Sequence, residues 1–143
     1  MKKLKSQDYF KEGSNTIGYV GDNFKKHFYG MEFTIPKKLS LKTKILERNM
    51  LDKDILSEFK PQESNLGELS YALQNDSILL KNGYANIFYI RDKNKVLWVL
   101  YFAWCSNDRG WGVGADPLGY PDDWDAGRQV LSCDFGNFET KKH

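Results

Sequence analysis

The feature that most constrains this chain is a run of ten residues, Val96 to Cys105, that is apolar on both faces. In a β-strand, alternate residues share a face. The even-numbered residues of the run are Val96, Trp98, Leu100, Phe102 and Trp104. The odd-numbered residues are Leu97, Val99, Tyr101, Ala103 and Cys105. A strand with two apolar faces is typical of the centre of a sheet that is covered on both sides.

Turn-forming segments flank this run and predict an antiparallel meander. Residues 86–91 predict a strand before the turn at 92–95, and residues 111–115 predict a strand after the turn at 106–110. Strands joined by turns this short are antiparallel. We therefore expect an antiparallel β-meander over about 85–115.

The third strand of this meander has one face without side chains. Its residues alternate between glycine and larger types: Gly110, Trp111, Gly112, Val113, Gly114 and Ala115. An unfilled groove would lose dispersion contacts, so we expect a large side chain, such as Trp98 or Trp104, to cover the glycines. A bound ligand is the alternative occupant.

Other segments predict an α+β fold around the meander. A helix is predicted near 65–75, where Asn65 is a favourable N-cap and Glu68 can complete a capping box. We expect this helix to pack on one face of the sheet. Alternating apolar residues predict a strand over 28–35, which should extend the sheet or pack across it, and 128–135 predicts another strand that extends the sheet.

The remaining segments complete a single domain over 1–143. Residues 17–20 predict a short strand, and Asp52 is expected to cap a short helix. Residues 1–16 predict a polar, loosely packed leader, and 136–143 a polar tail. A chain of 143 residues buries roughly two-thirds of its unfolded surface, so it needs neither a disulfide nor a metal to fold.

Composition limits the classes of function. Cys105 and Cys133, the only cysteines, are expected to be reduced residues of the core. No apolar signal segment follows the N-terminus and no stretch of about 18 apolar residues occurs, so we expect a cytoplasmic location and no membrane. The net charge is +2, with +5 on residues 1–60 and −3 on 61–143.

Residue patterns for catalysis are sparse. His27 and His143 are the only histidines, and we expect His27 to be an ordinary residue at the start of a strand. We find no nucleophile elbow and no phosphate-binding glycine loop. The acidic loop between Asp116 and Asp134 fails the spacing of an EF-hand, so we predict no metal and no cofactor.

Aromatic residues interleaved with charged ones are the most suggestive candidate site. Its residues are Trp104, Arg109, Trp111, Tyr120, Asp122, Asp123, Trp124 and Asp125. Aromatic faces beside carboxylates suit sugars, cationic groups or peptides. We therefore expect a binding or protein-interaction module whose protein or small-molecule partner the sequence does not identify. Tryptophans that fill the core are the alternative, although Trp124 is expected to be partly exposed between two aspartates.

Two other functions stay open. A carboxylate-dependent hydrolase of the glycoside type would use an acid/base pair from Asp116, Asp122, Asp123 and Asp125. The Lys-rich N-terminal half would instead bind nucleic acid or another anion. Its candidate residues are Lys25, Lys26, Lys37, Lys38, Lys42 and Lys44, with Phe24, Phe28 and Tyr29 for stacking. The acidic loop itself would repel phosphates.

Overall fold

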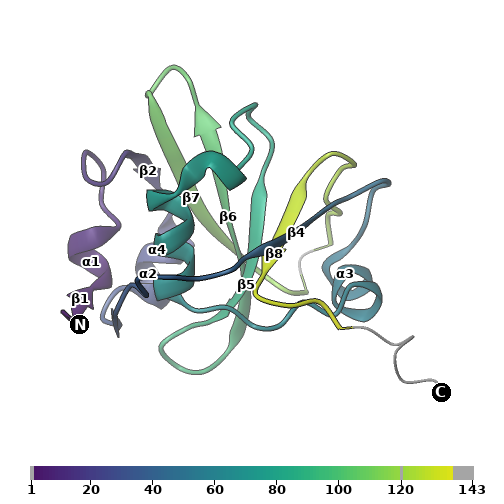
Figure 1. Cartoon of the computed structure of the whole chain (residues 1–143), viewed down its shortest axis with the longest axis horizontal. Helices are drawn as coiled ribbons and strands as arrows, with labels where there is room; N and C mark the ends of the chain where they lie inside the picture. The colour runs from purple at the N-terminus through teal and green to yellow at the C-terminus, as the bar shows by residue number, and fades with distance from the viewer. Residues whose placement is uncertain (1, 120, 137–143) are drawn as a thin grey trace.

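Six strands form a mixed sheet at the centre of the computed structural model, which describes residues 2–119 and 121–136 (Figure 1). The strands are β2 (Ile17–Val20), β4 (Lys42–Ile45), β5 (Asn86–Arg91), β6 (Leu97–Cys105), β7 (Gly110–Pro117) and β8 (Gln129–Ser132). Their order across the sheet is β2-β7-β6-β5-β8-β4. The β2–β7 and β5–β8 pairs are parallel, and the other neighbours are antiparallel. The fold is α+β, as predicted.

The predicted meander is formed by β5, β6 and β7, with β6 in the middle. The register places Tyr89 opposite Val99 and Phe102 opposite Val113. Even-numbered residues of β6 such as Leu100 join one buried cluster, and odd-numbered residues such as Val99 join another. The prediction of a central strand is therefore confirmed, and both of its faces are covered around Val99 and Leu100, whereas Tyr101 and Ala103 on the odd-numbered face are only half-buried.

Helices cover the two faces of the sheet unequally. The buried residues of α1 (Ser6–Tyr9), α2 (Asp22–Phe28) and α4 (Leu66–Gln74) pack on the face that carries Leu100 and Phe102, which we call the helical face. On the other face, which we call the α3 face, α3 (Asp52–Glu58) packs near Val99 and Val130. Figure 1 shows α1, α2 and α4 gathered together and α3 at the opposite end of the sheet.

The helix predicted near 65–75 forms as α4. Asn65 Oδ1 accepts a hydrogen bond from the Glu68 N–H at 2.9 Å, which caps the first turn. The apolar stripe is buried on the helical face: Leu66, Leu69, Ala72 and Leu73. A short 3₁₀ turn, η1 (Asp76–Ile78), follows the helix. The prediction that this helix packs on one face of the sheet is confirmed.

The strand predicted over 28–35 is wrong in its extent, and it does not join the main sheet. α2 runs to Phe28, and β3 covers only Glu32–Phe33. β3 pairs with β1 (Leu4–Lys5) in a separate two-stranded sheet. Alternate residues of this segment, such as Met31 and Ile35, pack on the helical-face core. An extended chain that lies on a core therefore gives the same alternating pattern as a strand of the main sheet.

Residues 1–16 are not a loosely packed leader. Tyr9 and Phe10 are buried in the helical-face core, and Ser6 Oγ donates a hydrogen bond to the Phe28 carbonyl at 2.7 Å. Sequence reasoning missed this because the segment has no apolar period. An aromatic pair inside a polar stretch was the available signal.

The far end of the sheet was predicted only in part. β8 lies within the segment predicted at 128–135 and extends the sheet, as expected. β4, which pairs with β8 at the edge, was not predicted as a strand because its residues are Lys-rich and all four are exposed. The predicted tail lies outside the described residues apart from Gly136. In the described part of the chain, no helix has the length and apolar character to cross a membrane.

Candidate functional site

The predicted tryptophan site does not form one surface. Trp111 is fully buried in the helical-face core, and the ring of Trp104 contacts it with centroids 5.2 Å apart. The ammonium of Lys81 lies 4.5 Å from the centroid of Trp104. Trp124 packs on the α3 face, so the sheet separates it from the other two tryptophans.

The charged residues of the predicted site lie at the surface. Three of its carboxylates are exposed: Asp122, Asp123 and Asp125. Asp125 lies 3.9 Å from Arg128. Arg109 is exposed in the turn between β6 and β7, and Tyr120 lies outside the described residues. Trp124 is half-buried, so its predicted partial exposure is confirmed.

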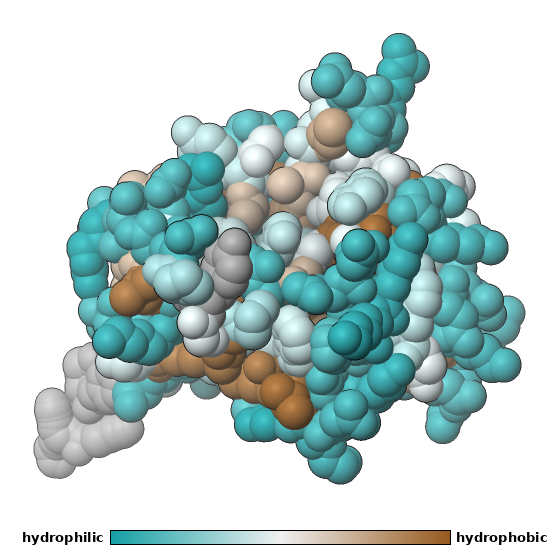
Figure 2. Space-filling view, turned by 180° about the vertical axis from the view of Figure 1, so that it is seen from behind, coloured by the Kyte–Doolittle hydropathy of each residue, from teal (hydrophilic) through white to brown (hydrophobic). Residues whose placement is uncertain are grey.

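A groove opens on the part of the α3 face that α3 leaves uncovered, and we call it the glycine groove. Its volume is about 350 Å³. It is lined by small residues of β6 and β7, chiefly Ala103, Gly112 and Gly114, and by the side chains of Tyr19, Asp22, Asn23, Tyr101 and Asp116. Figure 2 views this side of the molecule and shows near-neutral and apolar atoms bordered by hydrophilic ones.

The glycines of β7 meet different neighbours. A Cβ on Gly114 would lie 2.4 Å from the hydroxyl of Tyr101, so the ring of Tyr101 lies directly on the strand. A Cβ on Gly110 would lie 2.8 Å from the backbone nitrogen of Gly18, so the bare position lets β2 approach. A Cβ on Gly112 would meet only the Ala103 carbonyl, at 3.7 Å. Gly112 is thus the open part of the floor.

The prediction that a large side chain covers the glycines is therefore confirmed at Gly114 and wrong at Gly110, which the β2 backbone covers, and at Gly112, which stays open. Trp98 and Trp104, the proposed covers, belong to the helical face. The register explains the error, because β6 and β7 pair Trp104 with Trp111 and Tyr101 with Gly114. Counting back from the turn would have placed Tyr101 on the glycine side.

The lining of the groove is acidic. Asp22 and Asp116 are its carboxylates, and no lysine or arginine is among the described residues that line it. Burial raises the pKa of Asp116, and the nearby charges of Asp52 and Asp122 raise it further. The groove therefore carries two carboxyl groups, and no lysine or arginine from the described residues, beside two tyrosine residues.

A buried carboxylate holds Trp124 beside the groove. Asp52 Oδ1 accepts hydrogen bonds from Tyr89 Oη and Trp124 Nε1, each at 2.8 Å. Trp124 in turn contacts the groove residue Tyr101 edge to face, with ring centroids 5.4 Å apart. Burial raises the pKa of Asp52, although the two hydrogen bonds favour its ionised form. The prediction that Asp52 caps α3 is wrong, because Leu51 is the N-cap.

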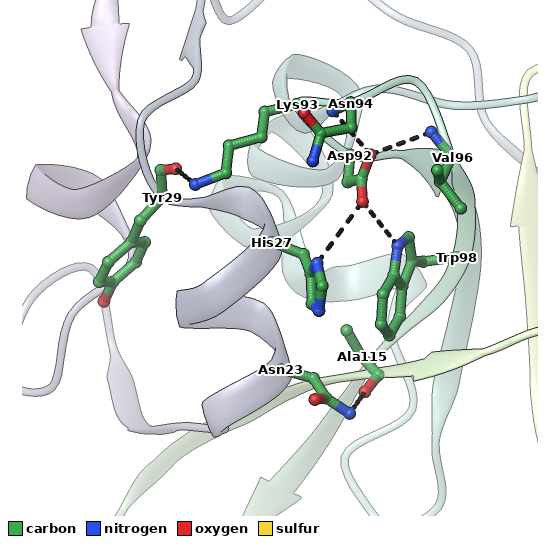
Figure 3. Close-up of polar contacts among 9 residues, drawn as sticks. All are labelled: Asn23, His27, Tyr29, Asp92, Lys93, Asn94, Val96, Trp98 and Ala115. Atoms are coloured by element: carbon green, nitrogen blue, oxygen red, sulfur yellow. Dashed lines mark hydrogen bonds and ion pairs between the residues drawn. The ribbon is translucent and has the colours of Figure 1, made fainter.

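A second buried carboxylate, Asp92, hydrogen-bonds Trp98, a residue of the helical face, and Figure 3 shows its contacts. Its Oδ1 accepts hydrogen bonds from the backbone N–H groups of Asn94 at 2.8 Å and Val96 at 3.0 Å. Its Oδ2 accepts from Trp98 Nε1 at 2.8 Å and lies 3.7 Å from His27 Nδ1. Burial opposes ionisation of Asp92, but these hydrogen bonds and His27 lower its pKa.

His27 belongs to a junction between α2 and the β5–β6 turn. It lies in the last turn of α2, not in a strand as predicted, and its ring lies on Trp98 with centroids 4.3 Å apart. The Lys93 N–H donates to the His27 carbonyl at 3.3 Å. Lys93 Nζ donates to the Tyr29 carbonyl, also at 3.3 Å (Figure 3). We interpret the His27–Asp92 pair as a structural contact that holds α2 against the β5–β6 turn.

Neither a metal centre nor a relative directs the choice of function. Within residues 2–119 and 121–136, no three side chains of His, Cys, Asp or Glu are grouped so that they would hold a metal ion. Comparisons of the chain with protein-family models, curated proteins and solved structures found no match. The argument for function therefore depends on the shape and charge of the glycine groove.

Proposed function

We propose that the protein is a binding module that holds a cationic group of its ligand, an ammonium or a guanidinium, in the glycine groove. The observation that supports this is the lining, in which Asp22 and Asp116 lie with Tyr19 and Tyr101 around bare backbone at Gly112. Carboxylates attract a cation, and the faces of tyrosine rings add cation–π attraction of about 0.5–2 kcal/mol.

The dimensions of the groove fit a single side chain or a small molecule. Its volume of about 350 Å³ is at the lower end of ordinary ligand pockets. The missing Cβ at Gly112 leaves room for a ligand to approach the strand backbone. Tyr19 is 56 % exposed, so its ring is available at the surface without any rearrangement of the core.

Substitutions in the groove test ligand binding with less damage to the fold than a substitution of Trp124 would cause. Truncating Trp124 would remove a hydrogen bond from the buried Asp52 and would disturb the fold as well as any site. In contrast, a Cβ on Gly112 meets only the Ala103 carbonyl, at 3.7 Å, and valine suits a strand, so Gly112→Val adds a side chain to the floor of the groove. Asp116→Asn keeps the shape of the side chain and removes its charge.

The experiment is an NMR titration with three blocked tripeptides that differ only in the central residue: arginine, lysine or glutamine. We expect the arginine and lysine peptides to shift the amides of Gly112 and Gly114, and the glutamine peptide to leave them unchanged. Gly112→Val and Asp116→Asn should each weaken binding by about tenfold. The exposed Asp123→Asn is the matched control and should bind like the wild type.

Two results would contradict the proposal. One is equal binding of the glutamine and arginine peptides, which would remove the role of charge. The other is unchanged binding in Gly112→Val with a spectrum that shows an intact fold, which would move the site elsewhere.

A second candidate function is carboxylate-dependent hydrolysis of a glycoside. The direction of the Asp116 pKa shift favours it, because the general acid of a carboxylate pair has a pKa above the ordinary carboxyl value. Asp22 in the same groove, or Asp122 nearby, would be the second carboxylate. Turnover of aryl glycosides that is lost in Asp116→Asn and kept in Asp123→Asn would support it; no turnover by the wild-type protein would remove it.

A further inference from the structure

β4 ends the sheet with an outer edge that no described strand pairs. The Leu46 N–H donates to the Arg128 carbonyl at 2.8 Å. The N–H and C=O groups of successive residues in a strand point to opposite sides. Lys42 and Lys44, which are two and four residues from Leu46, therefore direct their N–H and C=O groups toward β8. Thr43 and Ile45 consequently direct their N–H and C=O groups outward, and all four residues are exposed.

The opposite edge of the sheet is closed by the chain itself. The Gly13 N–H donates to the Ile17 carbonyl at 2.8 Å, and Glu12 Oε2 accepts from the Val20 N–H at 3.1 Å. Residues 12–14 therefore cover β2, whereas no described segment covers β4 in the same way. A row of outward backbone groups is a template for another strand.

The free edge is strongly basic. Five cations and one acid occur in residues 37–48: Lys37, Lys38, Lys42, Lys44, Arg48 and Glu47. Lys42 pairs with Asp134 at 3.1 Å and Arg48 with Glu58 at 2.6 Å. Lys37, Lys38 and Lys44 are also exposed, so residues 37–48 keep an excess of positive charge.

A hollow lies next to this edge, where side chains of an added strand would fit. Its volume is about 370 Å³. Its lining residues are Lys44, Ile45, Glu47, Arg48, Met50 and Phe59. Lys44 Nζ lies 5.6 Å from the centroid of the Phe59 ring, so the hollow combines an aromatic ring with a positive charge.

We propose that β4 binds an extended, acidic peptide segment as an added strand of the sheet. Backbone hydrogen bonds to Thr43 and Ile45 would provide the pairing, and the surrounding lysines would select acidic side chains. A second copy of this chain is a poor occupant, because pairing β4 with itself would bring Lys42 and Lys44 near the same lysines.

The test uses the ¹⁵N-labelled protein and three probes: a blocked seven-residue peptide of alternating Glu and Val, its Lys/Val counterpart, and a ten-nucleotide oligo(dT). We expect the Glu/Val peptide to shift the Thr43 and Ile45 amides and to bind at least about tenfold more tightly than the Lys/Val peptide. No shift along β4 at about 2 mM Glu/Val peptide would overturn the proposal. Tighter binding of oligo(dT) at β4 would also overturn it, in favour of nucleic acid.

Two variants separate charge from backbone pairing. The double variant Lys42→Glu with Lys44→Glu should reverse the preference between the two peptides. The control Lys11→Glu with Lys26→Glu changes the net charge by the same amount at exposed sites away from β4, and it should keep the preference of the wild type. Thr43→Pro removes an outward N–H and should weaken Glu/Val binding by about tenfold. Unchanged binding in Thr43→Pro, or sedimentation of the free protein as a dimer that protects the β4 amides, would overturn the inference.

Discussion

Asp92 and Asp52 both accept a hydrogen bond from a tryptophan indole, yet their pKa values move in opposite directions. Burial acts on both carboxylates. At Asp92 two backbone amides from the β5–β6 turn add to the indole, and the ionised form is favoured. At Asp52 a phenol and an indole share Oδ1, and burial prevails. The ionised form of Asp92 therefore has partners that Asp52 lacks, namely two backbone amides and His27 in addition to an indole.

Asp92 and Asp52 also differ in where they lie relative to the glycine groove. Asp92 lies under α2 and fastens elements of the helical face, where the core is closed. Asp52 lies on the face that opens into the glycine groove, and its charge acts on the groove residue Asp116. Asp92 thus stabilises the closed helical face, whereas Asp52 belongs to the face that carries the groove.

The largest effect is expected for Asp92→Asn. The amide cannot accept hydrogen bonds on both sides, so it leaves a buried donor without a partner, and the free energy of unfolding should fall by about 2–3 kcal/mol. Urea denaturation at pH 7 measures this loss. The exposed Asp123→Asn should stay within about 0.5 kcal/mol of the wild type. Equal stability of the two variants would show that Asp92 does not stabilise the fold.

The pH dependence of stability should have opposite signs at the two carboxylates. The folded-state pKa of Asp92 lies below its ordinary value of 3.8, so the advantage of the wild type over Asp92→Asn is present above about pH 4 and is lost as pH falls through the folded pKa. The folded-state pKa of Asp52 lies above 3.8, so the wild type gains on Asp52→Asn as pH falls from 7 through that pKa. Urea denaturation between pH 7 and about pH 3 measures both differences, and movement in the same direction would refute the comparison.

A smaller effect is expected on the open face. Gly114→Ala forces the Tyr101 ring away from the strand and should cost about 1 kcal/mol. Gly112→Ala meets only the Ala103 carbonyl at 3.7 Å and should change stability by less than about 0.5 kcal/mol in either direction. Thermal denaturation of the pair measures the difference, and equal stability would mean that Tyr101 does not cover Gly114.

Only a small effect is expected for Asp52→Asn at pH 7. Its carbonyl oxygen can still accept from Tyr89 and Trp124, and the substitution removes the cost of burying a charge. The free energy of unfolding at pH 7 should change by less than about 1 kcal/mol. A loss as large as that of Asp92→Asn in urea denaturation would remove the distinction between the two carboxylates.

The centre of the fold could be predicted from the sequence because local patterns determine it. The two apolar faces over 96–105 require burial on both sides, and Asn65 with its apolar stripe specifies α4. The segment at 28–35 could not be assigned in this way, because alternation reports one-sided burial and not strand pairing. β4 has no apolar pattern at all, so only its pairing with β8 reveals it.

The sequence predicted that β7 has a bare face, but it did not predict which residues line the groove there. The alternating glycines indicated a bare face on β7, but Tyr19 and Asp22 reach it through the β2–β7 pairing, which joins distant segments. The tryptophan site was predicted from nearness in the sequence. Neighbouring residues of a strand point to opposite faces, so closeness along the chain does not establish a shared surface.

The strand order has a consequence for the time course of synthesis. β2 and β4 come from the N-terminal third of the chain, and their partners β7 and β8 follow roughly 90 residues later. At about 5–20 residues per second, a ribosome needs roughly 5–20 s to make that interval. During this time Phe24 and Phe28, buried in the finished protein, have no sheet to pack against. The N-terminal third is therefore the part of the nascent chain that is open longest to a chaperone.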